Sequence, residues 1–133
     1  MGVVVGYTGF VAVGVGGVLG CWLRWWLAVA FNPLFPNLPL GTLAANLVGG
    51  LLMGVALGVF DHFTTLPVEA RLLVATGFLG GLTTFSTFSA ETTGLLLREQ
   101  YGWFAAHVGS HLVGSIVMTI TGLFITRGVL KHF

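Results

Sequence analysis

The chain has 133 residues and a net charge of +1, and 56% of its residues are hydrophobic while only 7% are charged. Soluble globular chains carry roughly a quarter charged residues, so this composition excludes a soluble domain and predicts a protein whose main partner is the lipid bilayer. The few Lys and Arg residues are scattered along the chain, which excludes a basic surface for nucleic acid.

Four hydrophobic stretches divide the chain. A membrane-spanning helix needs about 20 predominantly apolar residues, and we expect spans at about 5–30, 41–60, 71–97 and 103–127. Together they predict one all-α transmembrane domain. Arg24 has Trp22, Trp25 and Trp26 beside it, a cluster typical of an anchor at the membrane interface from which a long cationic side chain reaches the headgroups.

The loop charges show little asymmetry. Four spans place both termini and the middle loop on one side of the membrane, with Arg71, Arg127 and Lys131, while the other side has Arg24 and Arg98. Proteins with a single orientation usually show a clear excess of Lys and Arg on the cytoplasmic side. This weak bias predicts that the chain inserts in both orientations.

Glycine is frequent, with 21 residues, and many glycines recur at helical spacing. Gly16 and Gly20 share one face of the first span, and Gly50, Gly54 and Gly58 share one face of the second. Small residues at this spacing let helix backbones approach closely in lipid. Four such tightly packed helices enclose little interior of their own, so a polar path is more naturally built between subunits.

The third span contains glycines and β-branched residues at 77–89 in place of good helix formers. We expect the helix to break in mid-membrane at 80–83, because backbone freed at this depth is tolerated only where it is buried in protein or lines a cavity. Freed carbonyl groups would suit Na⁺, whereas freed amides and nearby hydroxyls would suit an anion. The alternative is an unbroken glycine-rich helix.

Two polar or aromatic features accompany this segment. Phe85 and Phe88 would share a helix face with Ser89 close by, and the electropositive edges of their rings could give an anion a weak contact. Asn46 lies on the glycine face of the second span and can donate two hydrogen bonds. The alternatives are ordinary core packing for the rings and a purely structural hydrogen bond for the amide.

The fourth span carries a polar stripe, in which His107, His111, Ser115 and Thr119 recur every four residues and Ser110 lies close beside them. Two histidines at this spacing could ligate a metal. No third ligand is apparent on the same helix, so we favour polar packing or the lining of a wet path.

Sequence features of an enzyme are missing: there is no nucleophile elbow, phosphate loop or pair of carboxylates within a span. Glu91 is most simply interpreted as a carboxylate near the membrane interface. Hydroxyls and amides without an evident acid or base are typical of a permeation path rather than a reaction centre.

Three segments together resemble the Fluc (CrcB) family of small fluoride channels. They are the glycine and arginine pattern at 16–24, Gly-Thr-Leu-x-x-Asn-x-x-Gly at 41–49, and Gly-Gly-x-Thr-Thr-Phe-Ser-Thr-Phe at 80–88. The last string is long and highly specific. The sequence departs from the family pattern at Cys21, where alanine is usual, at Trp25, where tyrosine is common, and at the histidines of the fourth span.

The resemblance implies an antiparallel, dual-topology homodimer with two passive, highly selective pores that export fluoride across the inner membrane of a bacterium. It also implies one structural Na⁺ at the dimer interface, held by the backbone carbonyls of Gly80 and Thr83. Arg24 and Glu91 are further candidate site residues. The expected pore residues are Asn46, Phe85, Phe88, Ser86, Ser89, Ser110, Ser115 and Thr119.

Two other functions compete with a channel. A small dual-topology multidrug antiporter would also have four helices, but its proton exchange needs a carboxylate deep in the first span, which has none. A membrane assembly subunit without transport activity would explain the glycine packing but not the Thr-Thr-Phe-Ser-Thr-Phe string.

Overall fold

The computed structural model describes residues 6–133, and these form an all-helical structure. The expected start of the first span, near residue 5, lies outside the described residues. In chain order the helices are α1 (Tyr7–Phe31), a 3₁₀ turn (Asn32–Leu34), α2 (Leu40–His62), α3 (Val68–Arg71), a π-helical stretch (Leu72–Leu79), α4 (Gly80–Leu82), α5 (Ser86–Leu97) and α6 (Tyr101–Leu130).

Among residues 6–133, four helical segments are long and apolar enough to cross a membrane, which confirms the number of spans expected from the sequence. They are Tyr7–Leu34, Leu40–His62, Val68–Leu97 and Tyr101–Leu130. The third combines α3, the π-helical stretch, α4 and α5. A π turn at this place was not foreseen, because glycine-rich apolar sequence does not distinguish it from α-helix.

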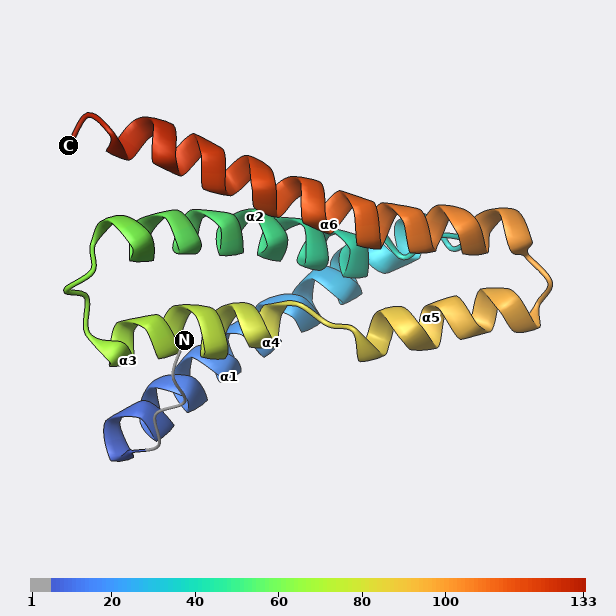
Figure 1. Ribbon diagram of the computed structural model, residues 1–133. Helices are drawn as coiled ribbons and strands as arrows, with labels where there is room; N and C mark the ends of the chain where they lie inside the picture. Colours follow the sequence, from blue (N-terminus) through green and yellow to red (C-terminus); the bar gives the residue numbers. More distant parts are fainter. Residues whose placement is uncertain (1–5) are drawn as a thin grey trace.

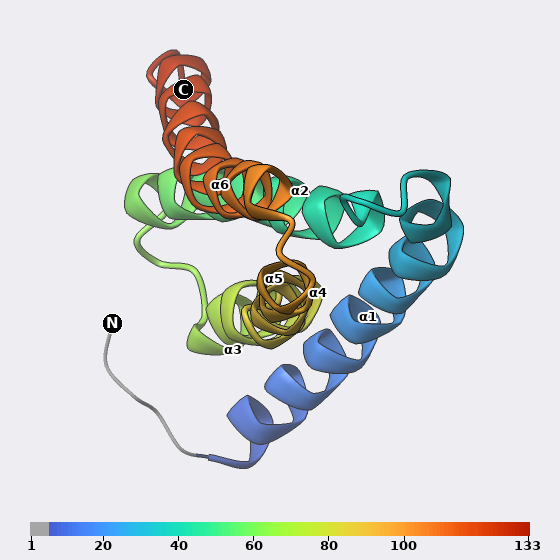
Figure 2. The ribbon, with the colours of Figure 1, turned by 90° about the vertical axis from the view of Figure 1, so that its right-hand side faces the viewer.

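The helices are arranged around the broken third segment (Figure 1). α2 and α6 pack along each other, α5 contacts the first half of α6, and α1 packs against the π-helical stretch and α4. In the end view, α1 runs along one side of the third segment, and α2 and α6 lie above that segment (Figure 2). The arrangement leaves the region beside the break open on one side.

The glycine stripes bring helices into backbone contact, as the sequence predicts. A Cβ added at Gly54 would clash with the Thr119 carbonyl oxygen and lie 2.7 Å from the Leu123 nitrogen. Gly16 meets the backbone of Leu73 and Phe78 in the same way, and Gly20 meets that of Phe78 and Leu82. Only glycine allows these approaches, so the stripes fix how α1 and α6 pack.

The helix break lies three residues later than predicted. Gly80–Leu82 remain helical, and the unwound residues are 83–85, beginning with an extended Thr83 (φ −84°, ψ 156°). The missing side chain of Gly81 lets α1 approach the helix here, because a Cβ at this position would lie 2.6 Å from the Gly17 carbonyl oxygen. The chain unwinds only past this contact, at the two threonines.

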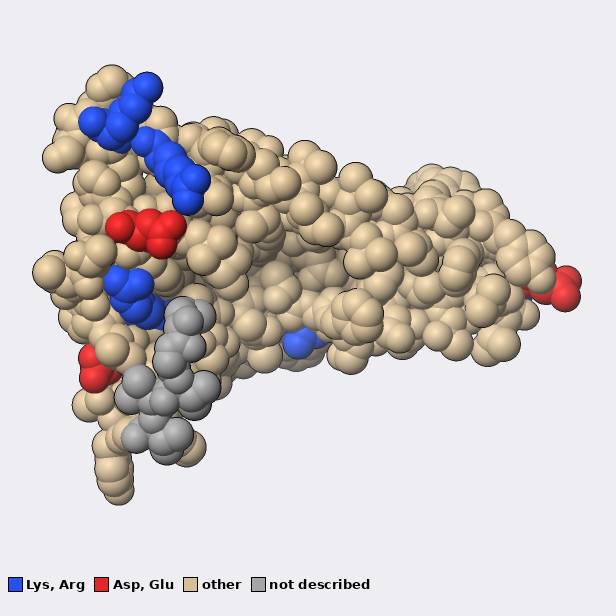
Figure 3. Space-filling view, in the orientation of Figure 1, with Lys and Arg blue, Asp and Glu red and all other residues tan. Residues whose placement is uncertain are grey.

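Charged side chains gather mainly at one end of the face seen in Figure 3, which is otherwise largely uncharged. There Arg71 donates to the carbonyl oxygens of Phe60 and Phe63, both at 3.3 Å, and so caps the last turn of α2. Arg127 and Asp61 lie 3.6 Å apart on the surface. Charges at the end of an otherwise apolar molecule are typical of the boundary between lipid and water.

Candidate functional site

A groove of about 360 Å³ lies beside the helix break, between α2, the unwound residues and α6. Most of its lining is apolar. Its polar lining residues are Asn46, Thr83, Thr84, His111, Ser115 and Thr119, and the rings of Phe85 and Phe88 also border it. The structure therefore brings together five of the eight predicted pore residues.

Asn46 of α2 holds the unwound backbone in place. Its Oδ1 accepts from the Thr84 backbone N–H at 2.8 Å, and its Nδ2 donates to the Thr84 carbonyl oxygen at 3.0 Å. These two bonds fix the orientation of the amide, because the Thr84 N–H needs an oxygen acceptor and the Thr84 carbonyl oxygen needs an N–H donor. The second Nδ2 proton points to Nδ1 of His111, 2.9 Å away. The alternative of a structural asparagine is thus partly correct, since the amide both secures the break and lines the groove.

The two phenylalanines differ in their surroundings. Their rings meet edge to face with centroids 5.6 Å apart. Phe88 is 6% exposed and stacks on His107 and His111, with centroids at 5.3 and 4.7 Å. Phe85 is 73% exposed at the rim of the groove. The Phe88 ring is therefore part of the core, whereas the Phe85 ring faces outward at the open side of the groove.

The α6 stripe divides into groove-lining and buried positions. Thr119 lines the groove while its hydroxyl donates to the Gly50 and Ser115 carbonyl oxygens, both at 2.9 Å. Within residues 6–133 no hydrogen bond is made by the Ser115 hydroxyl, which leaves it free to donate. Ser110 instead bonds to its own helix, at the Ala106 carbonyl oxygen, 2.7 Å away, and does not line the groove.

Ser86 and Ser89 are also outside the groove and exposed. The Ser86 hydroxyl lies 3.4 Å from that of Thr84. Because the break occurs later than predicted, α5 begins only at Ser86, and the helix then turns these two hydroxyls away from Asn46. Within one chain, these two serines do not line the groove, and their role at the pore stays a prediction.

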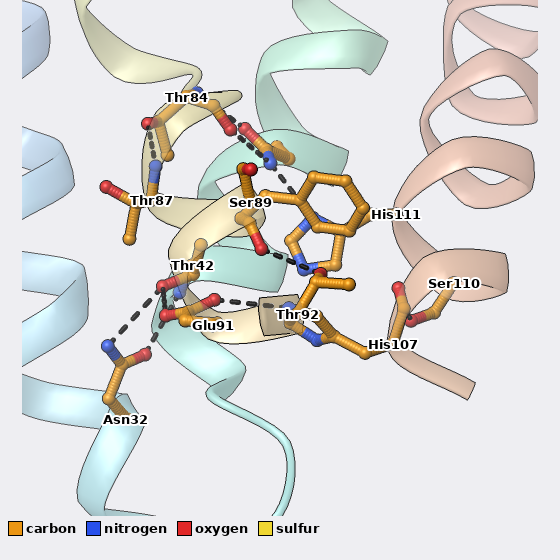
Figure 4. Close-up of polar contacts among 12 residues, drawn as sticks. Asn32, Thr42, Thr84, Thr87, Ser89, Glu91, Thr92, His107, Ser110 and His111 are labelled. Atoms are coloured by element: carbon orange, nitrogen blue, oxygen red, sulfur yellow. Dashed lines mark hydrogen bonds and ion pairs between the residues drawn. The ribbon is translucent and has the colours of Figure 1, made fainter. Parts of the chain in front are cut away.

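Glu91 is half-buried between α2, α5 and α6, where its carboxylate has partners from the protein (Figure 4). Its Oε2 accepts from the Thr42 hydroxyl at 2.7 Å, and its Oε1 lies 3.2 Å from Nε2 of His107, a side chain with no exposed surface. The second half-helix points the carboxylate inward. Thr42 and its contact to Asn32 were missed, although Thr42 precedes Asn46 by one helical turn.

Arg24 is not a free interfacial anchor. Its Nε donates to the Gly81 carbonyl oxygen at 2.9 Å, at the level of the break and one and a half to two turns before α1 ends at Phe31. The tryptophans beside it remain exposed. The crossing of α1 over α4 brings this side chain to the break, which span boundaries alone could not show.

The expected Na⁺ ligands have free carbonyl groups. In an unbroken helix the Gly80 oxygen would accept from Thr84 and the Thr83 oxygen from Thr87. Here the Thr84 N–H goes to Asn46 and the Thr87 N–H to the Thr84 hydroxyl, at 3.1 Å. Within residues 6–133 no hydrogen bond reaches either oxygen. Oxygen donors of this kind suit a hard cation.

Comparison with known proteins identifies the family. The family described as "CrcB-like protein, Camphor Resistance (CrcB)" matches residues 11–123. A relative from Nitrosospira multiformis is 58% identical over 127 residues, which cover 96% of this chain and 99% of the relative. Relatives from Cupriavidus pinatubonensis (57% over 122 residues; 92% and 97% covered) and Ralstonia nicotianae (58% over 119; 90% and 94%) are similar over nearly the same length.

All three relatives bear the name "Fluoride-specific ion channel FluC". The matches confirm the resemblance drawn from the three motifs and the expectation that the chain is no enzyme, because the relatives are named as ion channels. With four membrane-spanning helices and this similarity over nearly its whole length, the chain belongs to the CrcB-like family of fluoride-specific ion channels.

Proposed function

We propose that this chain forms a passive, fluoride-selective pore that lets F⁻ leave the cytoplasm of a bacterium across its inner membrane. The observation that carries the proposal is the Asn46 amide lodged at the helix break with its second proton in the groove. Membership of the fluoride channel family supports the choice of ion. No ATP-binding motif is present in the sequence, so the ion moves down its own gradient.

Fluoride passage is chiefly a problem of desolvation. A small anion loses tens of kcal/mol of hydration in a low-dielectric medium unless protein donors replace the water. Asn46 of α2 and the free Ser115 hydroxyl of α6 supply such donors in the groove. An ion at Asn46 would take over the proton now given to His111, because a hydrogen bond to an anion is roughly twice as strong as one to a neutral acceptor.

The phenylalanines would offer a contact that is weak enough for the ion to leave. Their ring edges carry the positive part of the aromatic quadrupole, and conduction needs binding that is favourable on entry but easily reversed. Chloride is larger, and we attribute its exclusion to a narrow bore with donors spaced for the smaller ion.

The complete pore is proposed to need a second copy in antiparallel orientation, which gives two pores for each homodimer. Phe85 is largely exposed at the open side of the groove, so a partner would complete the wall. The weak bias of Lys and Arg between the two sides supports dual topology.

One Na⁺ is proposed at the centre of that dimer, where two copies would supply four carbonyl oxygens from Gly80 and Thr83. Those oxygens have no hydrogen-bond donor within residues 6–133, so their chemistry fits the ion. The cation would hold the two helix breaks together. Replacing Na⁺ with a large organic cation should then lower the temperature at which the purified dimer dissociates.

The decisive experiment is fluoride efflux from liposomes that contain the purified protein, followed with a fluoride electrode in the presence of a K⁺ ionophore. Rapid fluoride loss and negligible chloride loss are expected. Efflux that requires an imposed proton gradient would favour the antiporter instead. No efflux from folded, dimeric protein would leave the assembly subunit.

A further inference from the structure

We propose that Glu91, His107 and His111 form a binding site for a divalent transition-metal cation of the Zn²⁺ class, next to the groove. The three side chains come from α5 and α6, and each offers a ligand atom within 4.8 Å of the other two. The sequence shows that the two histidines lie one helical turn apart on α6. It does not show the third ligand, because only folding brings Glu91 of α5 next to them.

The polar atoms of this cluster are not satisfied by the protein. Four buried atoms have no hydrogen-bond partner among the described residues: Oε1 of Glu91, Nδ1 and Nε2 of His107, and Nε2 of His111. Oε1 and the His107 Nε2 lie 3.2 Å apart without the geometry of a hydrogen bond. Unpaired buried polar groups are costly, and a cation between these atoms would satisfy three of them together.

The spacing fits tetrahedral coordination after a small inward movement. Zinc bonds to imidazole nitrogen and carboxylate oxygen are about 2.0–2.2 Å long, which places neighbouring ligands roughly 3.3–3.5 Å apart. The three atoms are within 4.8 Å now, so side-chain rotations that move each atom by about 1 Å are enough. Two imidazoles and one carboxylate favour Zn²⁺, Co²⁺ or Ni²⁺ over Mg²⁺ and Ca²⁺.

The supporting contacts resemble those that hold metal ligands in place. The Thr42 hydroxyl donates to Oε2 of Glu91 at 2.7 Å and orients the carboxylate so that Oε1 faces the histidines. Phe88 stacks on both imidazole rings and limits their rotation. Such outer contacts typically affect metal affinity by about 10–100-fold.

Metal binding would break the bond between His111 and Asn46. In that bond Nδ1 of His111 accepts, so the neutral ring carries its proton on Nε2. If the metal takes Nδ1, it displaces the amide proton. If it takes Nε2, the ring proton must move to Nδ1, which can then no longer accept from Asn46.

An effect on transport follows, and this step rests on the proposed function. A cation bound at His111 would lie beside the groove and hold fluoride there too strongly for it to leave, because conduction needs weak, reversible binding. Zn²⁺ should therefore slow fluoride efflux.

The test is Zn²⁺ binding to the purified, full-length protein by calorimetry, with the absorption spectrum of bound Co²⁺ as a measure of tetrahedral coordination. We expect one saturable site per chain. Glu91→Gln and His107→Gln should each lower the affinity by roughly tenfold or more. His62→Gln is the matched control, because His62 is exposed at the end of α2 and lies outside the cluster.

Equal affinity in the wild type and in a folded Glu91→Gln or His107→Gln variant would overturn the proposal, as would the lack of saturable binding at millimolar Zn²⁺. Size-exclusion profiles show which variants fold, and Glu91→Gln preserves the shape of the side chain if His107→Gln does not fold. Zinc binding without fluoride efflux under any condition would refute the proposed function but not the site. Efflux without zinc binding would refute only the site.

Discussion

Replacement of Gly54 by alanine tests whether close backbone contact between α2 and α6 sets both the stability and the width of the groove. The new Cβ would clash with the Thr119 carbonyl oxygen and lie 2.7 Å from the Leu123 nitrogen. Both neighbours are backbone atoms of a regular helix, so no side-chain rotation can relieve the contact. The whole of α6 must move away from α2.

The cost can be worked out from the contacts that this movement affects. Overpacking a well-packed site typically costs about 1–3 kcal/mol. The 2.9 Å bond from the Thr119 hydroxyl to the Gly50 carbonyl oxygen would also weaken, which is worth about 0.6 kcal/mol for an average bond between membrane helices. Alanine returns about 1 kcal/mol of helix propensity. We therefore expect a net loss of about 0.6–2.6 kcal/mol.

The assay compares Gly54→Ala with Gly128→Ala in the same detergent. A Cβ at Gly128 meets no atom within 4 Å, so this control keeps the change in helix propensity and omits the clash. Gly54→Ala should unfold at a lower temperature than the wild type, and its fluoride efflux should fall because Gly50 and Thr119 line the groove. Equal unfolding temperatures for the two variants would refute the reasoning.

Three further predictions concern the break and the rings. Asn46→Ala should destabilise the protein by about 1–3 kcal/mol for each of the two Thr84 backbone groups left without a partner, and abolish efflux; full efflux would contradict a role at the pore. Phe88→Ala should cost about 3–5 kcal/mol in thermal unfolding, because that ring is 6% exposed within its own chain, whereas Phe85→Ala, at a ring that is 73% exposed there, should cost less stability and reduce efflux; a loss at Phe88 no greater than that at Phe85 would refute the difference in packing. Arg24→Met should speed amide hydrogen exchange at 83–85, since the carbonyl oxygen that the guanidinium caps loses its donor; unchanged exchange would show that Arg24 does not hold the break.

Composition and periodicity were enough to predict the four spans and the glycine contacts. These features depend on local sequence, because span length follows from runs of apolar residues and close helix approach follows from glycines four apart. Gly54 and Gly20 illustrate this, since each lies against the backbone of a neighbouring helix. Span lengths and close helix contacts can therefore be predicted from local sequence.

The positions of Arg24 and Glu91 could not be predicted in the same way. Both are charged residues in otherwise apolar stretches, and such residues usually end a span. In the structure their partners come from distant parts of the chain, Gly81 for Arg24 and Thr42 with His107 for Glu91. Only the crossing of α1 over α4 and the offset of α5 from α4 create these contacts.

The location of the break follows from the partners of individual backbone groups rather than from glycine content. Gly80 and Gly81 have weak helix propensity, yet both remain helical, and Gly81 packs closely against α1. The chain unwinds where Asn46 offers replacement bonds to both backbone groups of Thr84. In lipid a break is possible only where such replacements exist, so the asparagine determines where the helix ends.

At the break, some backbone groups have side-chain hydrogen-bond partners, whereas others have none and are free to bind an ion. Asn46 satisfies Thr84, and Arg24 satisfies the Gly81 carbonyl oxygen, so the unwound segment is held from α2 and α1 at once. The oxygens of Gly80 and Thr83 are left without a donor within residues 6–133. A break secured in this way cannot widen easily, and a rigid bore is what discrimination between fluoride and a larger halide requires. Loosening the Arg24 support alone, which leaves Asn46 in the proposed pore, should therefore reduce selectivity before it abolishes flux.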